Sequence, residues 1–219
     1  MTTRRSILAA GAAGLLPAGL AAPALAQGAA RNVLRFIPHS NLASIDPVGT
    51  TGYIVRNHGY MVYDTLFATD AEFRIRPQMV ESWEGSGTDL VWTFRLREGL
   101  RFHDNEPVRA QDVIPSLRRW GARDSFGQTL MAAVAEMSVV DDRSFRIRLS
   151  RPFPLLIDAI GKLSSQVPFI MHERHASLDP NTPVPEAVGS GPFRFLRDPW
   201  VPGSPAVYEN FAGSVPPHQ

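Results

Sequence analysis

Apolar and polar residues alternate strictly in two segments of the chain. In the sequence LVWTFRL at 90–96, one set of alternate side chains is wholly apolar and the other is mixed. This period of two is typical of a strand with one buried face. The segment 145–149 alternates in the same way, after an apolar run at 137–140 and two aspartates at 141–142. Because a short polar link between two such runs favours a hairpin, we predict one across 137–149.

Helical spacing appears in longer segments. Val55, Gly59, Val62 and Leu66 recur at intervals of four, three and four residues. This spacing places all four side chains on one side of a helix, which we predict over 53–67.

A second helix is predicted over 108–120, with Val113, Leu117 and Trp120 facing inward and Pro115 in the first turn. Hairpins interleaved with helices indicate an α+β or mixed α/β fold. The remaining predicted elements are helices at 126–136 and 153–162, short strands at 33–37, 167–171, 191–196 and 206–208, and a proline-rich loop at 178–186.

The first 26 residues have the pattern of an export signal. Arg4 and Arg5 precede a weakly hydrophobic stretch rich in alanine and glycine, and residues 24–26 fit an A-x-A cleavage site. A membrane-spanning anchor is the alternative, but Pro17 and several glycines disfavour it. We therefore expect residues 1–26 to be removed.

The same segment indicates a route and a location. The sequence TRRSIL at 3–8 resembles a twin-arginine signal, the kind that exports folded proteins. The mature chain, residues 27–219, is therefore expected in the periplasm, with no membrane insertion after the signal is removed.

Composition narrows the range of partners. The 22 basic residues nearly balance the 21 acidic residues, for a net charge of +1, so no strong field favours nucleic acid or an anionic membrane. The absence of cysteine excludes disulfides, cysteine nucleophiles and thiolate metal sites. With 44% hydrophobic residues, the chain has enough apolar surface to bury a core.

Candidate catalytic residues are few, and recognised nucleophile, phosphate-loop and zinc motifs are absent. His103 beside Asp104 permits an acid–base interpretation, but capping of a turn by the carboxylate explains the pair more simply. His172 and His175 stand three residues apart and would suit a metal, although a solvated helix start is the simpler explanation. We expect no catalytic residue, no cofactor and no metal site.

Aromatic residues are divided between core and surface. Trp83, Trp92 and Trp120 fall within predicted regular elements, so we expect them in the core. Tyr53 and Trp200 fall in or beside loops, where they are freer to face a ligand.

Several segments together resemble a known family. They are SIDP at 44–47, PQMVESW at 77–83, LVWTFRLR at 90–97, GLRFHD at 99–104, AQDV at 110–113 and GSGPF at 189–193. In this order they are similar to the fingerprint of extracellular solute-binding proteins of the peptide/nickel type, the receptors of ATP-driven importers. The resemblance extends from about residue 33 to residue 211.

The resemblance implies a two-lobed, periplasmic-binding-protein-like fold that closes around a ligand and then docks on an inner-membrane ABC permease. Members of the family are more than twice as long as this chain, so residues 27–219 are expected to form an incomplete first lobe, truncated before the second. The implied ligand is a peptide or another small molecule, and the sequence leaves its identity open.

Two positions depart from the family pattern. Asn105 replaces a glycine in the turn after His103, and asparagine tolerates a left-handed backbone better than other non-glycine residues do. Arg109 stands where a threonine often caps the following helix, so we expect a weakened cap.

Candidate ligand contacts lie in the loop that resembles the family's early ligand-facing segment. They are Ser40, Asn41 and Leu42, with Tyr53 beyond them. Serine and asparagine can hydrogen-bond a ligand, and tyrosine supplies flat apolar area. Ordinary turn chemistry around residues 46–47 is the alternative interpretation.

Two other functions compete with that of a non-enzymatic transport receptor. One is a periplasmic interaction or sensing module that uses the same lobe without closing on a ligand. The other is a secreted hydrolase, which is disfavoured because no nucleophile stands in a recognisable strained turn.

Overall fold

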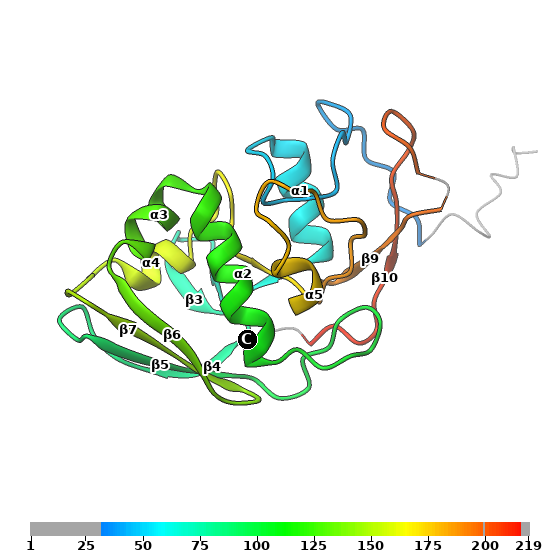
Figure 1. Ribbon diagram of the computed structural model, residues 1–219. Helices are drawn as coiled ribbons and strands as arrows, with labels where there is room; N and C mark the ends of the chain where they lie inside the picture. Colours follow the sequence, from blue (N-terminus) through cyan, green and yellow to red (C-terminus); the bar gives the residue numbers. More distant parts are fainter. Residues whose placement is uncertain (1–31, 199, 216–219) are drawn as a thin grey trace, which may run out of the picture. The chain divides into compact units, whose positions relative to one another are not determined.

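The computed structural model describes residues 32–198 and 200–215, and the chain divides into two compact units, residues 1–37 and 38–219 (Figure 1). Of the first unit, residues 32–37 are described; they form no strand, and Leu34 and Ile37 are 92% and 93% exposed. The predicted strand at 33–37 is therefore wrong, because the segment pairs with no described strand that would bury its apolar side chains. The predicted export signal lies outside the described residues.

Four antiparallel strands form the main sheet of the second unit, in the order β4-β5-β7-β6. In sequence order they are β4 (Val80–Glu84), β5 (Val91–Leu96), β6 (Val134–Asp141) and β7 (Ser144–Leu149). The register places Phe94 opposite Phe145, whose rings stack with centroids 5.0 Å apart. The sheet confirms the predicted strand at 90–96 and the predicted hairpin, whose first strand begins three residues earlier than expected.

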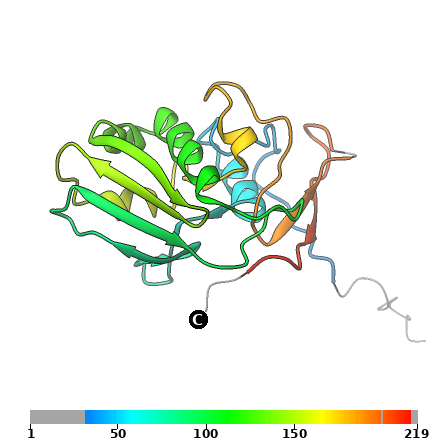
Figure 2. The same cartoon turned by 60° about the horizontal axis from the view of Figure 1, so that its bottom comes forward.

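Helix α2 (Ala110–Arg123) packs against one face of this sheet, and α3 (Ser125–Met131) follows it (Figures 1 and 2). The inward positions predicted for α2 are confirmed, since Val113, Leu117 and Trp120 have no exposed surface. Pro115 is the sixth residue of the helix, so it lies in the second turn and not in the first as predicted.

The start of α2 compensates for the missing threonine cap. The Arg109 side chain caps nothing, and its backbone N–H donates to Oδ2 of Asp112, 2.8 Å away. Asn105 has a φ of 69°, so the preceding turn keeps the left-handed residue that it requires.

Helices end earlier than predicted where the chain turns into a strand. Helix α1 covers Tyr53–Val62 and is followed by β1 (Asp64–Thr65) and β2 (Phe67–Thr69), so the helix predicted over 53–67 is too long. Likewise α3 ends at Met131, because the residues after it join β6 and pair with β7. The helix predicted at 153–162 is reduced to α4 (Leu156–Ile160), and α5 covers Glu173–Ala176.

Three antiparallel strand pairs complete the second unit. Strand β1 pairs with β8 (Phe169–Ile170), and β2 pairs with β3 (Ile75–Pro77), which was not predicted. Strand β9 (Phe193–Leu196) forms a hairpin with β10 (Val207–Asn210). The arrangement confirms a mixed fold of helices and antiparallel strands.

Buried apolar residues gather in two clusters. The first lies between the main sheet and α2 and contains Trp92 and Trp120, as predicted. Trp83 is 40% exposed at the sheet edge, so its assignment to the core is wrong. The second cluster, which we call the α1 core, contains Leu42, Ile45, Val48, Val55, Val62, Tyr63, Val167, Phe169, Met171, Ala176, Val184, Ala187, Phe195 and Trp200.

Trp200, which its place in a loop left freer to face a ligand, is instead 8% exposed, and its ring packs edge-on against Phe195. Among the described residues, no helix is both long and apolar enough to cross a membrane.

Candidate functional site

Helix α1 has one buried and one open side. Val55, His58, Gly59 and Val62 face the α1 core. Tyr53, Arg56, Asn57 and Tyr60 recur at the complementary helical spacing and stay partly or largely exposed. We call these four residues the outer face of α1.

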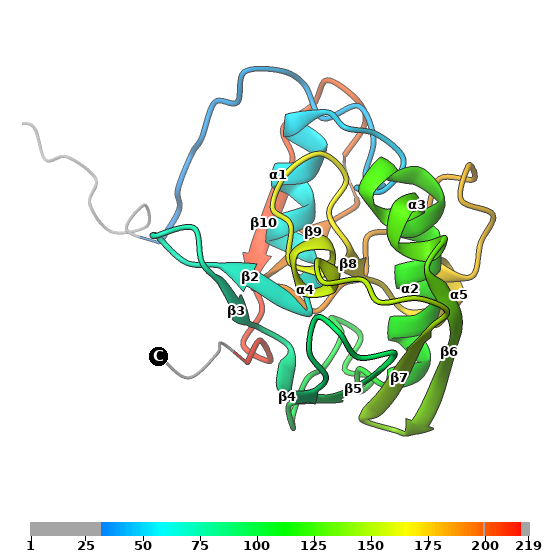
Figure 3. The same cartoon turned by 90° about the vertical axis from the view of Figure 1, so that its left-hand side faces the viewer.

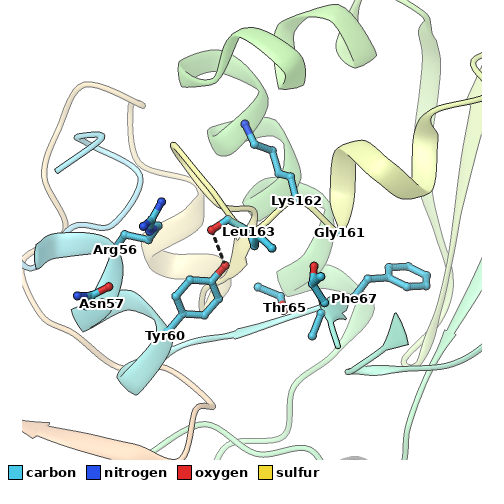
Figure 4. A pocket seen from close by; sticks show the side chains of 10 residues that line it. Arg56, Asn57, Tyr60, Thr65, Phe67, Gly161, Lys162 and Leu163 are labelled. Carbon is cyan, nitrogen blue, oxygen red and sulfur yellow. Dashed lines mark hydrogen bonds between the residues drawn. The ribbon is translucent and has the colours of Figure 1, made fainter. Parts of the chain in front are cut away.

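A hollow of about 320 Å³ opens beside this face (Figure 4). Figure 3 shows α1 beside the segment that follows α4. The hollow is lined by Arg56, Asn57 and Tyr60 from α1, by Thr65, Phe67, Ala68 and Thr69 from the β1–β2 region, and by Gly161, Lys162 and Leu163 after α4. We call it the α1 hollow.

Hydrogen bonds fix two sides of the α1 hollow. The Tyr60 hydroxyl donates to the carbonyl oxygen of Leu163 at 3.0 Å, which joins the helix to the segment after α4. Burial raises the pKa of Tyr60 to about 12, so the hydroxyl stays protonated at neutral pH. Lys162 Nζ lies 2.6 Å from Oδ2 of Asp124, which also caps α3.

Arg56 connects the α1 hollow to Tyr53. Its guanidinium carbon lies 4.5 Å from the centroid of the Tyr53 ring, a cation–π contact. Within the described part of the chain, no carboxylate forms an ion pair with Arg56. No described carboxylate therefore offsets its charge, and its N–H groups can donate to solvent or to a solute.

The residues predicted as ligand contacts fall into two groups. Ser40 and Asn41 are exposed, and Tyr53 is 62% exposed at the start of α1, with the His39 ring 6.3 Å from its own. Leu42 is 7% exposed and belongs to the α1 core. Their role in ligand binding stays a prediction.

A buried ion pair holds the loop that leads into α1. Asp46 Oδ2 accepts a hydrogen bond from Arg119 of α2 at 2.6 Å, and the two side chains are 2% and 1% exposed. The same carboxylate accepts from the backbone N–H groups of Val48, Gly49 and Val184. Arg119 also donates to three carbonyl groups of the segment 178–182. Two distant loops are thus fixed to one helix.

The C-terminal end of α1 is held by the glycines of the GSGPF segment. The Gly191 N–H donates to the carbonyl oxygen of Val62 at 2.9 Å. A Cβ on Gly189 would stand 2.0 Å from the same oxygen, so no other residue fits without a shift. His103 lies behind this contact: Nδ1 accepts from Gly189 N–H at 3.4 Å, and Nε2 donates to the Gly191 carbonyl at 3.0 Å.

These contacts give His103 a structural role. Burial lowers its pKa, which keeps the imidazole neutral, with one nitrogen accepting and the other donating. Asp104 accepts instead from the Glu106 N–H and from Arg174. The Asp104 carboxylate therefore caps a turn, as predicted, while His103 joins that turn to the GSGPF segment.

The inner side of α1 contacts the β9–β10 hairpin through His58. Its Nδ1 lies 2.8 Å from the Tyr208 hydroxyl, and its ring meets Phe195 edge-on at 5.0 Å. Burial lowers the pKa of His58 to about 4. The hairpin thus packs against the side of α1 opposite the outer face.

The second histidine pair does not form a metal cluster. His175 Nε2 lies 3.1 Å from Glu186, and His172 Nδ1 lies 3.8 Å from Asp112. No group of three histidine, cysteine, aspartate or glutamate side chains in the described residues is placed to hold a metal ion. The start of α5 is solvated at Glu173 and Arg174, as the sequence suggested, but His175 is buried and 4% exposed.

Sequence reasoning missed Arg56, Asn57 and Tyr60. The sequence feature that could have identified them is helical spacing: they recur on the side of the helix opposite Val55, Gly59 and Val62. They were missed for two reasons. A polar helix face is ordinarily only a solvated surface, and the segment that lines the other side of the α1 hollow lies about a hundred residues further along the chain.

Comparison with known families gives a match over residues 74–213, to the model described as bacterial extracellular solute-binding proteins, family 5, middle. The probable peptide ABC transporter periplasmic-binding protein y4tO of Sinorhizobium fredii is 42% identical over 176 residues, which cover 80% of this chain and 33% of that protein. Glutathione-binding protein GsiB of Escherichia coli is 28% identical over 152 residues, which cover 68% of this chain and 30% of that protein.

Solved structures of binding proteins superpose on this chain. The binding protein MoaA from A. tumefaciens R10, in complex with mannopinic acid, superposes with a TM-score of 0.66 at 26% identity, over 80% of this chain and 36% of that one. The murein tripeptide binding protein MppA of Escherichia coli gives a TM-score of 0.65 at 19% identity, over 80% and 37%, which shows the fold alone. The chain spans about a third of the length of the relatives that it matches.

Proposed function

This chain belongs to the bacterial extracellular solute-binding proteins of family 5, and on that premise we propose that the outer face of α1 forms part of a wall that holds a solute. The solute is a peptide or another small molecule, and the receptor delivers it to an inner-membrane ABC permease. The chain works in the periplasm and performs no catalysis.

One observation carries this proposal: an open hollow lies against a helix whose C-terminal end is fixed by Gly191 and whose preceding loop is fixed through Asp46. Binding sites combine a concave surface with a few well-placed polar groups. The α1 hollow offers the amide of Asn57, the hydroxyl of Thr69 and the guanidinium of Arg56. Tyr53 adds a flat exposed ring, and Ser40 and Asn41 lie in the loop that precedes α1.

The names of the relatives support the class of function. One is described as a probable peptide-transporter protein and another as a glutathione-binding protein. The first description names a periplasmic-binding protein of a peptide transporter, and the second names a small bound solute. The twin-arginine-like segment at 3–8 and the A-x-A site at 24–26 support export, with residues 1–26 removed.

Solute binding is tested by NMR titration of the chain with a panel of di- and tripeptides and other small solutes. We expect at least one solute to shift the amide signals of Asn57 and Leu163 saturably, and Tyr53→Ala to weaken that binding. Phe73→Ala, which removes a highly exposed ring of the β2–β3 turn and none of the outer face of α1, serves as the control. A panel that leaves these signals in place, or shifts them equally in the Tyr53→Ala variant, contradicts the proposal.

The permease partner is tested by capture of the cognate permease from detergent extracts, with and without solute. Capture that requires the solute supports a transport receptor. Capture of equal strength without solute supports the sensing alternative.

A further inference from the structure

The α1 hollow has an unbalanced charge. Its ten lining residues include two cations, Arg56 and Lys162, and no carboxylate. Over the whole chain, basic and acidic residues are almost equal in number, so this local imbalance is not a reflection of composition. An acidic group would enter the hollow without meeting a lining residue of its own sign.

Only one of the two cations is available to bind an acidic group. Lys162 donates to Asp124 at 2.6 Å, and that carboxylate is 1% exposed, so the ammonium is already neutralised. Arg56 forms no ion pair with any described carboxylate and has part of its surface in solvent. The free positive charge of the hollow therefore resides on Arg56.

The surroundings of Arg56 restrict its position. Its guanidinium lies over the Tyr53 ring, 4.5 Å from the centroid, and its stem leaves a helix whose C-terminal end is fixed by Gly191. A planar guanidinium binds a carboxylate through two parallel N–H···O bonds, and stacking on a ring leaves its N–H edge free for them. This combination suits a carboxylate better than a neutral group.

Resting on the proposed function, we propose that the α1 hollow is a subsite for a carboxylate of the solute, and that Arg56 is the residue that binds it. Asn57 and Thr69 then offer hydrogen bonds to the neutral polar part, and Leu163 contacts the apolar part. The chain thereby selects acidic solutes over their amides.

The proposal is tested with succinate and its neutral isostere succinamide, each titrated into the ¹⁵N-labelled chain at pH 7 and constant ionic strength. We expect succinate to shift the Arg56 Nε–H signal and the Asn57 amide saturably, and succinamide to bind about tenfold more weakly or not at all. Equal shifts with both compounds, or no shift with succinate, overturn the assignment.

Two variants separate Arg56 from general electrostatic attraction. Arg56→Gln should weaken succinate binding about tenfold or more, while its thermal unfolding temperature stays close to that of the parent. Arg118→Gln removes an exposed arginine of α2 outside the hollow and should leave succinate binding unchanged. Succinate binding that survives Arg56→Gln, or that falls equally in both variants, contradicts the proposal.

Failure of this inference can be told apart from failure of the proposed function. If neutral solutes shift Asn57 and Leu163 while succinate shifts nothing, the wall binds solutes and the carboxylate subsite is wrong. If succinate binds through Arg56 while capture of the permease is equally strong with and without solute, the subsite stands and the transport-receptor function fails.

Discussion

At the scale of single residues, the strongest constraint is the buried pair of Asp46 and Arg119. Every hydrogen bond of the carboxylate is internal, since it accepts from Arg119 and from three backbone N–H groups. Such a pair adds little stability over an apolar replacement, but removal of one partner leaves a buried charge without compensation. The pair therefore specifies where the loop before α1 lies.

Asp46→Asn should lower the free energy of unfolding by about 3–5 kcal/mol, because Arg119 would stay buried and unpaired. Urea denaturation measures this change. Glu136→Gln is the matched control, because it breaks an exposed pair with Arg148 and should cost within about 1 kcal/mol. Similar losses in the two variants would show that the Asp46 carboxylate is not required.

Protonation of the buried His58 makes the stability of the chain depend on pH. Its folded-state pKa of about 4 lies below the ordinary 6.5, so the folded chain binds fewer protons than the unfolded chain at intermediate pH. The contribution of His58 to the free energy of unfolding is therefore fully present above pH 6.5 and is lost as the pH falls toward 4. The full loss amounts to roughly 3 kcal/mol.

We expect the free energy of unfolding to fall between pH 7 and pH 4.5 more steeply in the parent chain than in His58→Gln. Asp64, whose pKa burial raises to about 6, contributes with the opposite sign, and it does so equally in both proteins. The difference between the two slopes in urea denaturation therefore isolates His58. Parallel slopes would contradict the assigned role.

At the scale of elements, the contact between α1 and the GSGPF segment depends on glycine. Gly189 and Gly191 approach the backbone of Val62 and Tyr63 so closely that a side chain would collide with main-chain atoms. A backbone collision cannot be relieved by a rotamer change, so the segments must move apart.

Gly189→Ala should lower the free energy of unfolding by about 2 kcal/mol or more, measured by thermal or urea unfolding. Gly49→Ala is the control, since a Cβ there would meet its nearest atoms at an ordinary 3.5 Å. A Gly189→Ala protein as stable as the control would mean that the approach is looser than described.

Elements in which apolar residues recur at a strict period were predictable from the sequence. The residues at which these elements begin and end were not. The alternation at 90–96 is maintained because one face of β5 packs against the interior, so its buried side chains must be apolar. Leu66 continues the helical spacing of α1, yet it lies in the link between β1 and β2. The link is buried and therefore also requires an apolar residue, so the spacing alone did not mark the end of the helix. At 134–136, pairing with β7 outweighs helix propensity.

The candidate site was predictable only in part, for a related reason. Tyr53 follows a glycine-containing loop, a position that indicates exposure, and it is exposed. Arg56 and Tyr60 gain significance only beside Leu163, and that proximity is a property of the fold and not of the local sequence. Leu42 lies in a loop that resembles a ligand-facing segment, but its side chain fills the α1 core.

At the scale of the whole molecule, the α1 hollow is partly open to solvent, and the chain spans about a third of the length of its relatives. A solute held against one wall keeps part of its surface in water. Hydrogen bonds gain strength when water is excluded, so those made by the α1 hollow alone would be weak.

The 219-residue chain by itself should therefore bind any peptide with a Kd weaker than about micromolar, as measured by calorimetry. Millimolar binding that is detectable only by NMR agrees with this expectation. A peptide that binds the chain with micromolar or tighter affinity would show that one wall suffices.

The loop before α1 is fastened to a distant part of the chain through Asp46 and Arg119, and the last turn of α1 is fastened through Gly189 and Gly191. The conformational entropy of this helix is accordingly lost during folding and need not be lost again when a solute arrives. Side chains on its outer face are preorganised, so replacing them should alter which solute is chosen more than how the protein folds.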